Sequence, residues 1–205
     1  MDTEISIADK PARERILLTA HDLFYRDGIR ATGIDKVIAE SGVSKVTFYR
    51  HFPSKNALIL AFLEYRHRRW IDWFTDSLQR HGAKSGGGLK PLIAALAEWF
   101  GNPVFRGCAF INITAELSDS IPGVLTICHN HKQDMLVIIA DLIPDSALRM
   151  TLANAVAVAV DGAIVKAQME SGSLNIHPQM ALSSLAVILD ALDNAAMTST
   201  KPQTP

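Results

Sequence analysis

The sequence is poor in cysteine and has no uninterrupted apolar run of membrane length. Its 205 residues include two cysteines, Cys108 and Cys128, which excludes a disulfide framework and a Cys-x-x-Cys zinc site. The longest apolar runs, Leu136–Ala140 and Ala155–Val160, are far shorter than the ~20 residues of a membrane span. The acidic N-terminus lacks a signal-peptide pattern. We therefore expect a cytoplasmic protein with no membrane partner.

The short motifs of the common enzyme classes are absent as well. No Gly-rich phosphate loop, nucleophile elbow or His-Glu-x-x-His occurs, and Gly86–Gly88 has the composition of a flexible linker. His129 and His131, with Cys128 or Asp134, resemble a metal cluster only superficially, because residues two apart on a helix face different directions. The sequence therefore predicts a protein that is not an enzyme and holds no metal or cofactor.

Charge is nearly balanced overall, at −1, but it is distributed unevenly. Residues 1–69 carry 12 lysines and arginines against 9 acids, whereas the remainder carries 8 against 12. Six of the cations lie within 41–69, where Glu64 is the single acid. A basic end on an acidic body is typical of a protein that touches a polyanion with one end only.

Apolar residues recur at three- and four-residue spacing along almost the whole chain, which predicts an all-α fold. Gly28 ends a first helix, Thr32-x-x-Asp35 has the form of a capping box, and Ser44 and Ser54 are expected to cap the next two helices. The fourth runs from 54 to 81. Further helices are expected at about 89–100, 107–117, 122–142, 146–171 and 178–197, with disordered tails at 1–9 and 198–205.

The segment 32–55 has the pattern of a helix-turn-helix. Two short helices joined by a tight turn at Gly42 can hold the second helix, 45–51, in a DNA major groove. Lys45 and Thr47 can reach base edges there, and Val46 can contact a thymine methyl group. The small core between the helices is expected from Ile34, Val37, Ile38, Val43 and Phe48.

The run 42–58, GVSKVTFYRHFPSKNAL, together with Phe24–Gly28, closely resembles the DNA-binding signature of the tetracycline-repressor (TetR) family of bacterial regulators. The resemblance is strong over residues 12–62. Two positions depart from it: Val46 stands where the family often has Gly, and Asn56 where it often has Glu. The resemblance implies a three-helix DNA-binding domain at 10–55, followed by a larger helical ligand-binding and dimerisation domain at 56–197.

The resemblance also implies the residues that contact DNA. Lys45, Val46 and Thr47 would face bases, whereas phosphates would be held by Thr32, Ser44, Tyr49, His51 and Lys55. Lys55 would add its cation to the positive end of the long helix's dipole. Tyr49 and Phe52 have an alternative interpretation as core residues, and His51 as an ordinary surface residue.

For the second domain, the resemblance implies an internal pocket for a small effector and a homodimer through the helices near 146–171 and 178–197. Small residues in 152–167 and the leucine stripe Leu182, Leu185, Leu189 and Leu192 support a four-helix dimer interface, with a core inside one chain as the alternative. An apolar or aromatic effector would suit the candidate pocket residues, which are Trp70, Phe74, Trp99, Phe105, Cys108, Phe110, Asn112, Glu116 and His129.

Two alternatives stay open. Residues 106–112 resemble a segment of family members that sense electrophiles, which makes Cys108 a candidate reactive thiol; the other interpretation is a small buried residue. The whole chain has a competing interpretation as a helical interaction module without specific DNA binding. The resemblance to the TetR family implies a repressor that leaves its operator when an effector binds.

Overall fold

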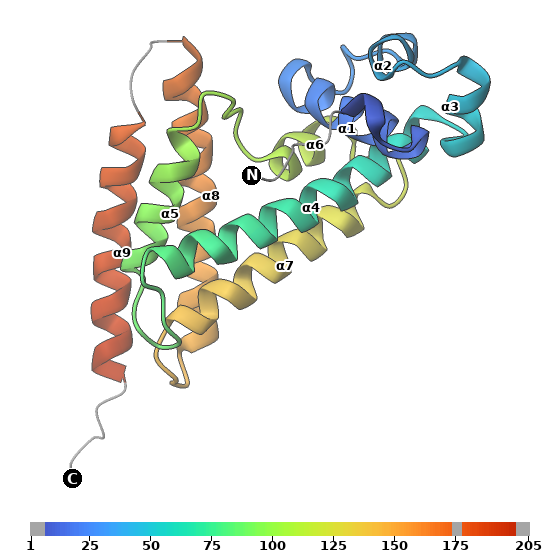
Figure 1. Ribbon diagram of the computed structural model, residues 1–205. Coiled ribbons are helices and arrows are strands. Elements are labelled where there is room, and N and C mark those ends of the chain that lie inside the picture. The colour runs from blue at the N-terminus through green and yellow to red at the C-terminus, as the bar shows by residue number, and fades with distance from the viewer. Residues whose placement is uncertain (1–6, 174–177, 200–205) are drawn as a thin grey trace. The chain divides into compact units, whose positions relative to one another are not determined.

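The computed structural model describes residues 7–173 and 178–199, and within these ranges every regular element is a helix (Figure 1). The all-α prediction is therefore confirmed, and the predicted segments coincide closely with the observed ones. In chain order the elements are a 3-10 helix at Ile7–Asp9 and the α-helices α1 (Ala12–Asp27), α2 (Ile34–Ser41), α3 (Lys45–His51), α4 (Lys55–Arg80), α5 (Lys90–Phe100), α6 (Ala109–Leu117), α7 (Val124–Leu142), α8 (Arg149–Ser173) and α9 (Gln179–Ser199).

Glycine and serine set the limits of the short helices. Gly42 ends α2 in the left-handed region, at φ +64°, where a residue without Cβ is unstrained. The Ser44 hydroxyl caps α3 by accepting the Thr47 N–H at 3.1 Å, and the Ser54 hydroxyl accepts the Ala57 N–H at 3.1 Å. Both serine caps are thus confirmed.

The predicted capping box at Thr32 is wrong. Gly33 occupies the N-cap position of α2 and makes no side-chain cap. The Thr32 side chain is fully buried, and its hydroxyl donates to the Gly28 carbonyl oxygen at 2.8 Å. A buried hydroxyl needs a partner, and the carbonyl four residues back satisfies it. Thr32 therefore braces the loop between α1 and α2.

The predicted disordered tails are shorter than expected at their inner ends. Ile7–Asp9 forms a 3-10 helix, and Arg15 Nη1 donates to the Ala8 carbonyl oxygen at 3.1 Å. At the other end, α9 includes Thr198 and Ser199. The remaining residues of both tails lie outside the described ranges.

The chain forms two compact units whose limits differ from the expected boundary at 55/56. The N-terminal unit comprises the described residues up to Arg68 together with Ile113–Cys128, and the C-terminal unit comprises Arg69–Asn112 and the described residues from His129 onward. The difference arises because α4 is continuous. Its first half supplies core to the N-terminal unit, where the Phe62 ring meets Phe24 of α1 at 5.4 Å.

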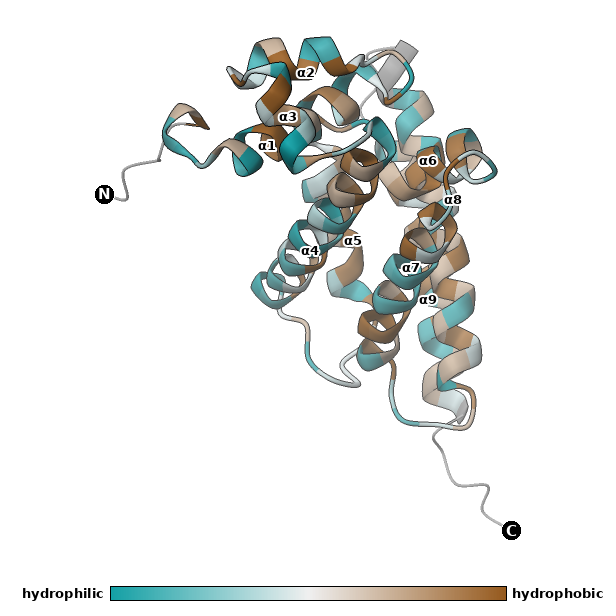
Figure 2. Ribbon diagram, turned by 90° about the vertical axis from the view of Figure 1, so that its right-hand side faces the viewer, coloured by the Kyte–Doolittle hydropathy of each residue, from teal (hydrophilic) through white to brown (hydrophobic). Residues whose placement is uncertain are grey.

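The C-terminal unit corrects the interpretation of the leucine stripe. Leu182, Leu185 and Leu189 of α9 are buried within their own chain, and α9 packs against α5 and α8. Hydrophobic residues recur along α8 and α9 (Figure 2), and those that stay exposed lie on other faces, with Val158 74% and Val187 71% exposed. The stripe is thus protomer core, as the alternative interpretation held.

The sequence has no uninterrupted apolar run of membrane length, but two whole helices are apolar on average. Arg149–Glu170 of α8 and Gln179–Thr198 of α9 are long and apolar enough to cross a membrane by length and composition alone. The same test is passed by helices that form the core of a soluble protein, so it is weak evidence for a span.

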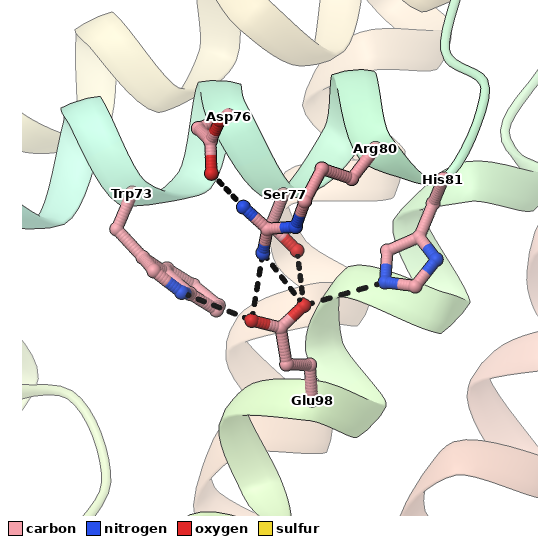
Figure 3. A network of polar contacts seen from close by, with 6 residues as sticks. All are labelled: Trp73, Asp76, Ser77, Arg80, His81 and Glu98. Atoms are coloured by element: carbon pink, nitrogen blue, oxygen red, sulfur yellow. Dashed lines mark hydrogen bonds and ion pairs between the residues drawn. The ribbon is translucent and has the colours of Figure 1, made fainter.

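A polar network centred on Glu98 joins α5 to the end of α4 (Figure 3). The Glu98 carboxylate accepts hydrogen bonds from Ser77 Oγ at 2.9 Å, Trp73 Nε1 at 3.3 Å and Arg80 Nη2 at 2.8 Å. His81 Nε2 lies 3.3 Å from the same carboxylate. Partial burial acts to raise the pKa of Glu98, but the donors from Ser77 and Arg80 outweigh it, so the pKa lies below its ordinary value of 4.5.

We expect Glu98→Gln to lower the free energy of unfolding at pH 7 by about 1 kcal/mol, because it weakens a partly exposed set of charge-assisted hydrogen bonds. Since the carboxyl pKa is depressed in the folded state, its contribution is complete above the unfolded value of 4.5 and is lost as pH falls through the folded pKa. Urea unfolding at pH 7 and pH 3 measures the gap between variant and wild type, which should narrow in acid. Glu64→Gln on the exposed side of α4 is the control. A gap that widens in acid would contradict the assignment.

Candidate functional site

One side of helix α3 packs against the rest of the N-terminal unit, and the opposite side, which we call the outer side, is exposed. Phe48 is fully buried and Phe52 is 3% exposed, so the ring at 52 is core. On the outer side, Lys45, Val46 and Arg50 are exposed, with Val46 at 71%. Thr47 and His51 are half-buried. The exposed side chains include two cations and an apolar surface at the N-terminal end of the helix, the composition that a DNA groove accepts.

The expected core beneath α3 forms only in part. Val37 and Phe48 are buried, whereas Ile34, Ile38 and Val43 are half-buried. The remaining cover comes from α1 and α4, whose buried side chains include Phe24 and Phe62.

Tyr49 is partly packed and partly exposed. Its side chain is 42% exposed on the outer side of α3, and its ring meets the buried Phe48 ring edge-on at 5.3 Å. A tyrosine whose ring packs on the protein and whose hydroxyl is exposed to solvent is common at binding surfaces. The ring thus packs on Phe48, and both interpretations of Tyr49, as a DNA contact and as a packing residue, are compatible with its position.

Lys55 begins α4 and is tied to the loop after α1. Its ammonium donates to the Ile29 carbonyl oxygen at 2.6 Å. Burial lowers the pKa of Lys55, and the nearby Glu116 carboxylate opposes that shift. Glu116 also lies 3.4 Å from Arg30 Nε, and its backbone carbonyl accepts from Arg30 Nη2 at 2.7 Å. The structure thus places Glu116, expected in the effector pocket, in the N-terminal unit.

The C-terminal unit brings the predicted pocket aromatics into ring contact. Trp70 stacks on Phe74 at 4.6 Å and meets Trp99 edge-on at 5.4 Å, and Trp99 meets Phe105 at 5.2 Å. All four side chains are buried. We call these rings, with Phe110 and His131, the aromatic cluster.

The sequence prediction chose His129 as a polar member, but the structure assigns that place to His131. His129 is exposed, whereas His131 is 1% exposed, stacks on Phe110 at 3.6 Å and meets Trp70 at 5.1 Å. The signal was present in the helical period of α7, whose buried positions include Val124, Cys128, His131, Met135 and Ile139. Asn112, another expected anchor, is half-buried and donates to the Arg106 carbonyl oxygen at 3.2 Å.

Two indole N–H groups of this region differ in their hydrogen bonding. Trp73 Nε1 donates to Glu98 at 3.3 Å. Trp70 Nε1 is buried and has no acceptor among the residues that the structure describes. A buried donor without an acceptor is costly, so Trp70 Nε1 is a candidate contact for an external group.

Cys108 is 4% exposed and directly precedes α6, where its carbonyl oxygen accepts the Asn112 N–H at 3.1 Å. A reactive thiol is normally partly accessible, so this burial favours the packing interpretation over the sensor hypothesis. No group of three or more metal-binding side chains occurs within residues 7–173 and 178–199.

In the N-terminal unit, α2 is followed by a tight glycine turn and by α3, a capped helix of seven residues with an exposed side. This arrangement is a helix-turn-helix. The model of the family described as bacterial regulatory proteins, tetR family, matches residues 16–62. Residues 16–62 therefore belong to the DNA-binding region of this family, whose members are DNA-binding transcriptional regulators.

Solved and curated relatives agree with this assignment. A TetR-family regulator from Streptomyces coelicolor is 27% identical, with a TM-score of 0.78 over 90% of this chain and 89% of that one. The uncharacterised regulator YerO of Bacillus subtilis is 47% identical over 53 residues, which are 26% of this chain and 18% of YerO. The repressor NemR of Escherichia coli is 27% identical over 112 residues, 52% of this chain and 54% of NemR. The chain thus spans between about a fifth and about half of the length of the curated relatives that it matches.

We expect Tyr49→Phe to weaken DNA binding by about threefold to tenfold and to leave the thermal unfolding midpoint unchanged, because the ring stays on Phe48 and only the hydroxyl is lost. Fluorescence anisotropy with a labelled duplex measures the affinity. Phe48→Leu is the contrasting variant, since it alters the buried ring and should lower stability. Unchanged affinity in Tyr49→Phe would leave Tyr49 with the packing role alone.

Proposed function

We propose that this chain is a non-catalytic, cytoplasmic repressor that binds a two-fold-symmetric operator as a homodimer and is released by a small aromatic effector. The observation that carries the proposal is the exposed outer side of α3, with Lys45, Val46 and Tyr49 outward and Phe48 buried beneath. Base contacts from Lys45, Val46 and Thr47, and phosphate contacts from Ser44, Tyr49, His51 and Lys55, fit this arrangement. Thr32 would support these contacts only by fixing its loop, because its hydroxyl is buried and already donates to the Gly28 carbonyl oxygen.

A homodimer accounts for the exposed apolar side chains of the last two helices. Val158 and Met169 of α8, and Val187 and Ile188 of α9, are between 44% and 74% exposed. Ala155 and Gly162, also exposed on α8, would allow close helix approach. Two such helices from each subunit make a four-helix interface with two-fold symmetry. A dimer of this kind supplies the two recognition helices that a symmetric operator requires.

Selection from a pool of random duplexes at moderate salt tests the proposal most directly. We expect enrichment of a palindrome whose half-site centres are about 34–36 Å apart, the separation that two recognition helices on one face of B-DNA require. Enrichment of a single half-site would contradict the dimer. Binding that is absent at any salt would favour the alternative, a helical interaction module without DNA binding.

The effector proposal rests on the aromatic cluster and on Trp70 Nε1. A planar aromatic molecule would suit the ring-lined surroundings, and a carbonyl or similar acceptor on it would satisfy the buried indole N–H. Trp70 lies on α4, the same continuous helix that begins at Lys55. An effector held by Trp70 therefore acts on the helix that bears a proposed phosphate contact. It shifts the population away from the DNA-competent form if it prefers the other form.

Matched probes separate the hydrogen bond from simple burial. We expect 2-acetylnaphthalene to bind more tightly than 2-ethylnaphthalene and to shift one indole resonance in a ¹H–¹⁵N spectrum, the one that disappears in Trp70→Phe. Trp70→Phe should reduce affinity for the acetyl probe by about threefold to tenfold, the usual effect of one neutral hydrogen bond.

Trp73→Phe is the matched control, because the N–H that it removes is already used by Glu98. Equal losses in the two variants, or equal affinity for the two probes, would contradict the role of Trp70 Nε1.

A further inference from the structure

An exposed ion pair links the first turns of the two helix-turn-helix helices. Lys45 is the first residue of α3, Asp35 lies in the first turn of α2, and Lys45 Nζ lies 3.5 Å from Asp35 Oδ1. The two side chains are 65% and 88% exposed. An exposed pair of this kind contributes little to folding stability, so stability does not account for its presence.

The position of the carboxylate is unfavourable for a purely electrostatic interaction with DNA. Helix α3 carries no acid, and Asp35 adds a negative charge beside the lysine that would otherwise be attracted to phosphates. Asp27 of the same unit, in contrast, is held by two cations, Arg26 at 2.8 Å and Lys36 at 2.9 Å. Asp35 is instead presented outward next to a residue proposed to face bases.

A carboxylate beside an ammonium matches one base pair in the major groove. Across that groove a G·C pair presents two acceptors, guanine N7 and O6, followed by one donor, the cytosine N4 amino group. Guanine O6 and cytosine N4 are themselves one hydrogen bond apart, about 2.9 Å, close to the 3.5 Å between Lys45 Nζ and Asp35 Oδ1. The lysine can donate to guanine while the aspartate accepts from cytosine.

An A·T pair is unfavourable at both positions. Adenine has the N6 amino group where guanine has O6, so the lysine ammonium, a donor, would face a second donor. Thymine O4 is an acceptor where cytosine has its amino group, so it faces the carboxylate with a second acceptor. The ion pair therefore combines attraction to G·C with repulsion of A·T, the usual basis of strong discrimination.

On these grounds we propose that Asp35 and Lys45 together recognise one G·C base pair in each half-site, with Lys45 on guanine and Asp35 on cytosine. The proposal rests on the proposed function, because it needs α3 to lie in the major groove. It adds Asp35, a residue of α2, to the determinants of operator specificity.

Selection and sequencing with the full-length wild type, Asp35→Ala, Lys45→Ala and the double variant test the proposal. In the wild type, one column of each half-site should be G·C, and replacing it by A·T in a purified duplex should weaken binding by about 5- to 100-fold. Each single variant should reduce that ratio at the same column. The double variant should abolish it while the other columns remain.

The Lys45→Ala background distinguishes direct recognition by Asp35 from an effect exerted through the lysine. If Asp35 itself accepts a hydrogen bond from cytosine, adding Asp35→Ala to the Lys45→Ala variant reduces the ratio of G·C to A·T affinity further. No further change would mean that Asp35 only orients Lys45, and that result overturns the proposal. The proposal is also overturned if the two single variants alter different columns, or if the shared column is not G·C.

Glu40→Ala is the matched control, because it removes one exposed acid from the same helix. Both Glu40→Ala and Asp35→Ala should bind a random duplex more tightly than the wild type, but only Asp35→Ala should change base preference. Thermal unfolding of each variant verifies the fold. If the wild type itself enriches no sequence, the proposed function fails, an outcome distinct from wild-type enrichment that Asp35→Ala leaves unchanged.

Discussion

Burial of Phe48 is the constraint on which the DNA-facing surface depends. A seven-residue helix is too short to be stable alone, so α3 exists because its one fully buried ring anchors it and Ser44 caps its start. Once position 48 points inward, the helical period turns positions 46 and 50 to the opposite side of α3. Lys45, at the start of the helix, and Tyr49, at its flank, are exposed as well. The candidate contacts are therefore consequences of one packing interaction. Their chemistry is free to vary without loss of the fold.

The loop between α1 and α2 extends this constraint to the long helix. The Thr32 hydroxyl donates to the Gly28 carbonyl oxygen, and the Lys55 ammonium donates to the Ile29 carbonyl oxygen. Two adjacent carbonyl groups of the loop are therefore fixed, one by the residue before α2 and the other by the first residue of α4. An ammonium has three N–H donors, and Ile29 uses one. Two N–H donors thus remain for the phosphate contact proposed for Lys55, which would link the position of α4 to the geometry of DNA binding.

Local signals predicted the fold well, whereas the functional surfaces depended on contacts that a sequence does not display. Gly42, Ser44 and Ser54 act through backbone within a few residues, and each was predicted correctly. His129 was chosen in place of His131, and Glu116 was expected in the effector pocket, because these assignments depend on partners far along the chain, such as Trp70 for His131 and Arg30 for Glu116. The period of α7 would have identified His131 as buried, but no local pattern pairs Glu116 with Arg30.

The leucine stripe of α9 shows why an apolar face does not identify its partner. Leu185 and Leu189 have the spacing of a dimer interface, yet they are satisfied within the chain. Val187 and Ile188, interleaved with them, are left exposed. A helix that is apolar on two faces must be covered on both. Packing of α5 and α8 accounts for the first face, and the second is the one that the proposed dimer would use. In the proposed dimer a second copy would cover this face symmetrically and would supply the second α3 that a palindromic operator requires.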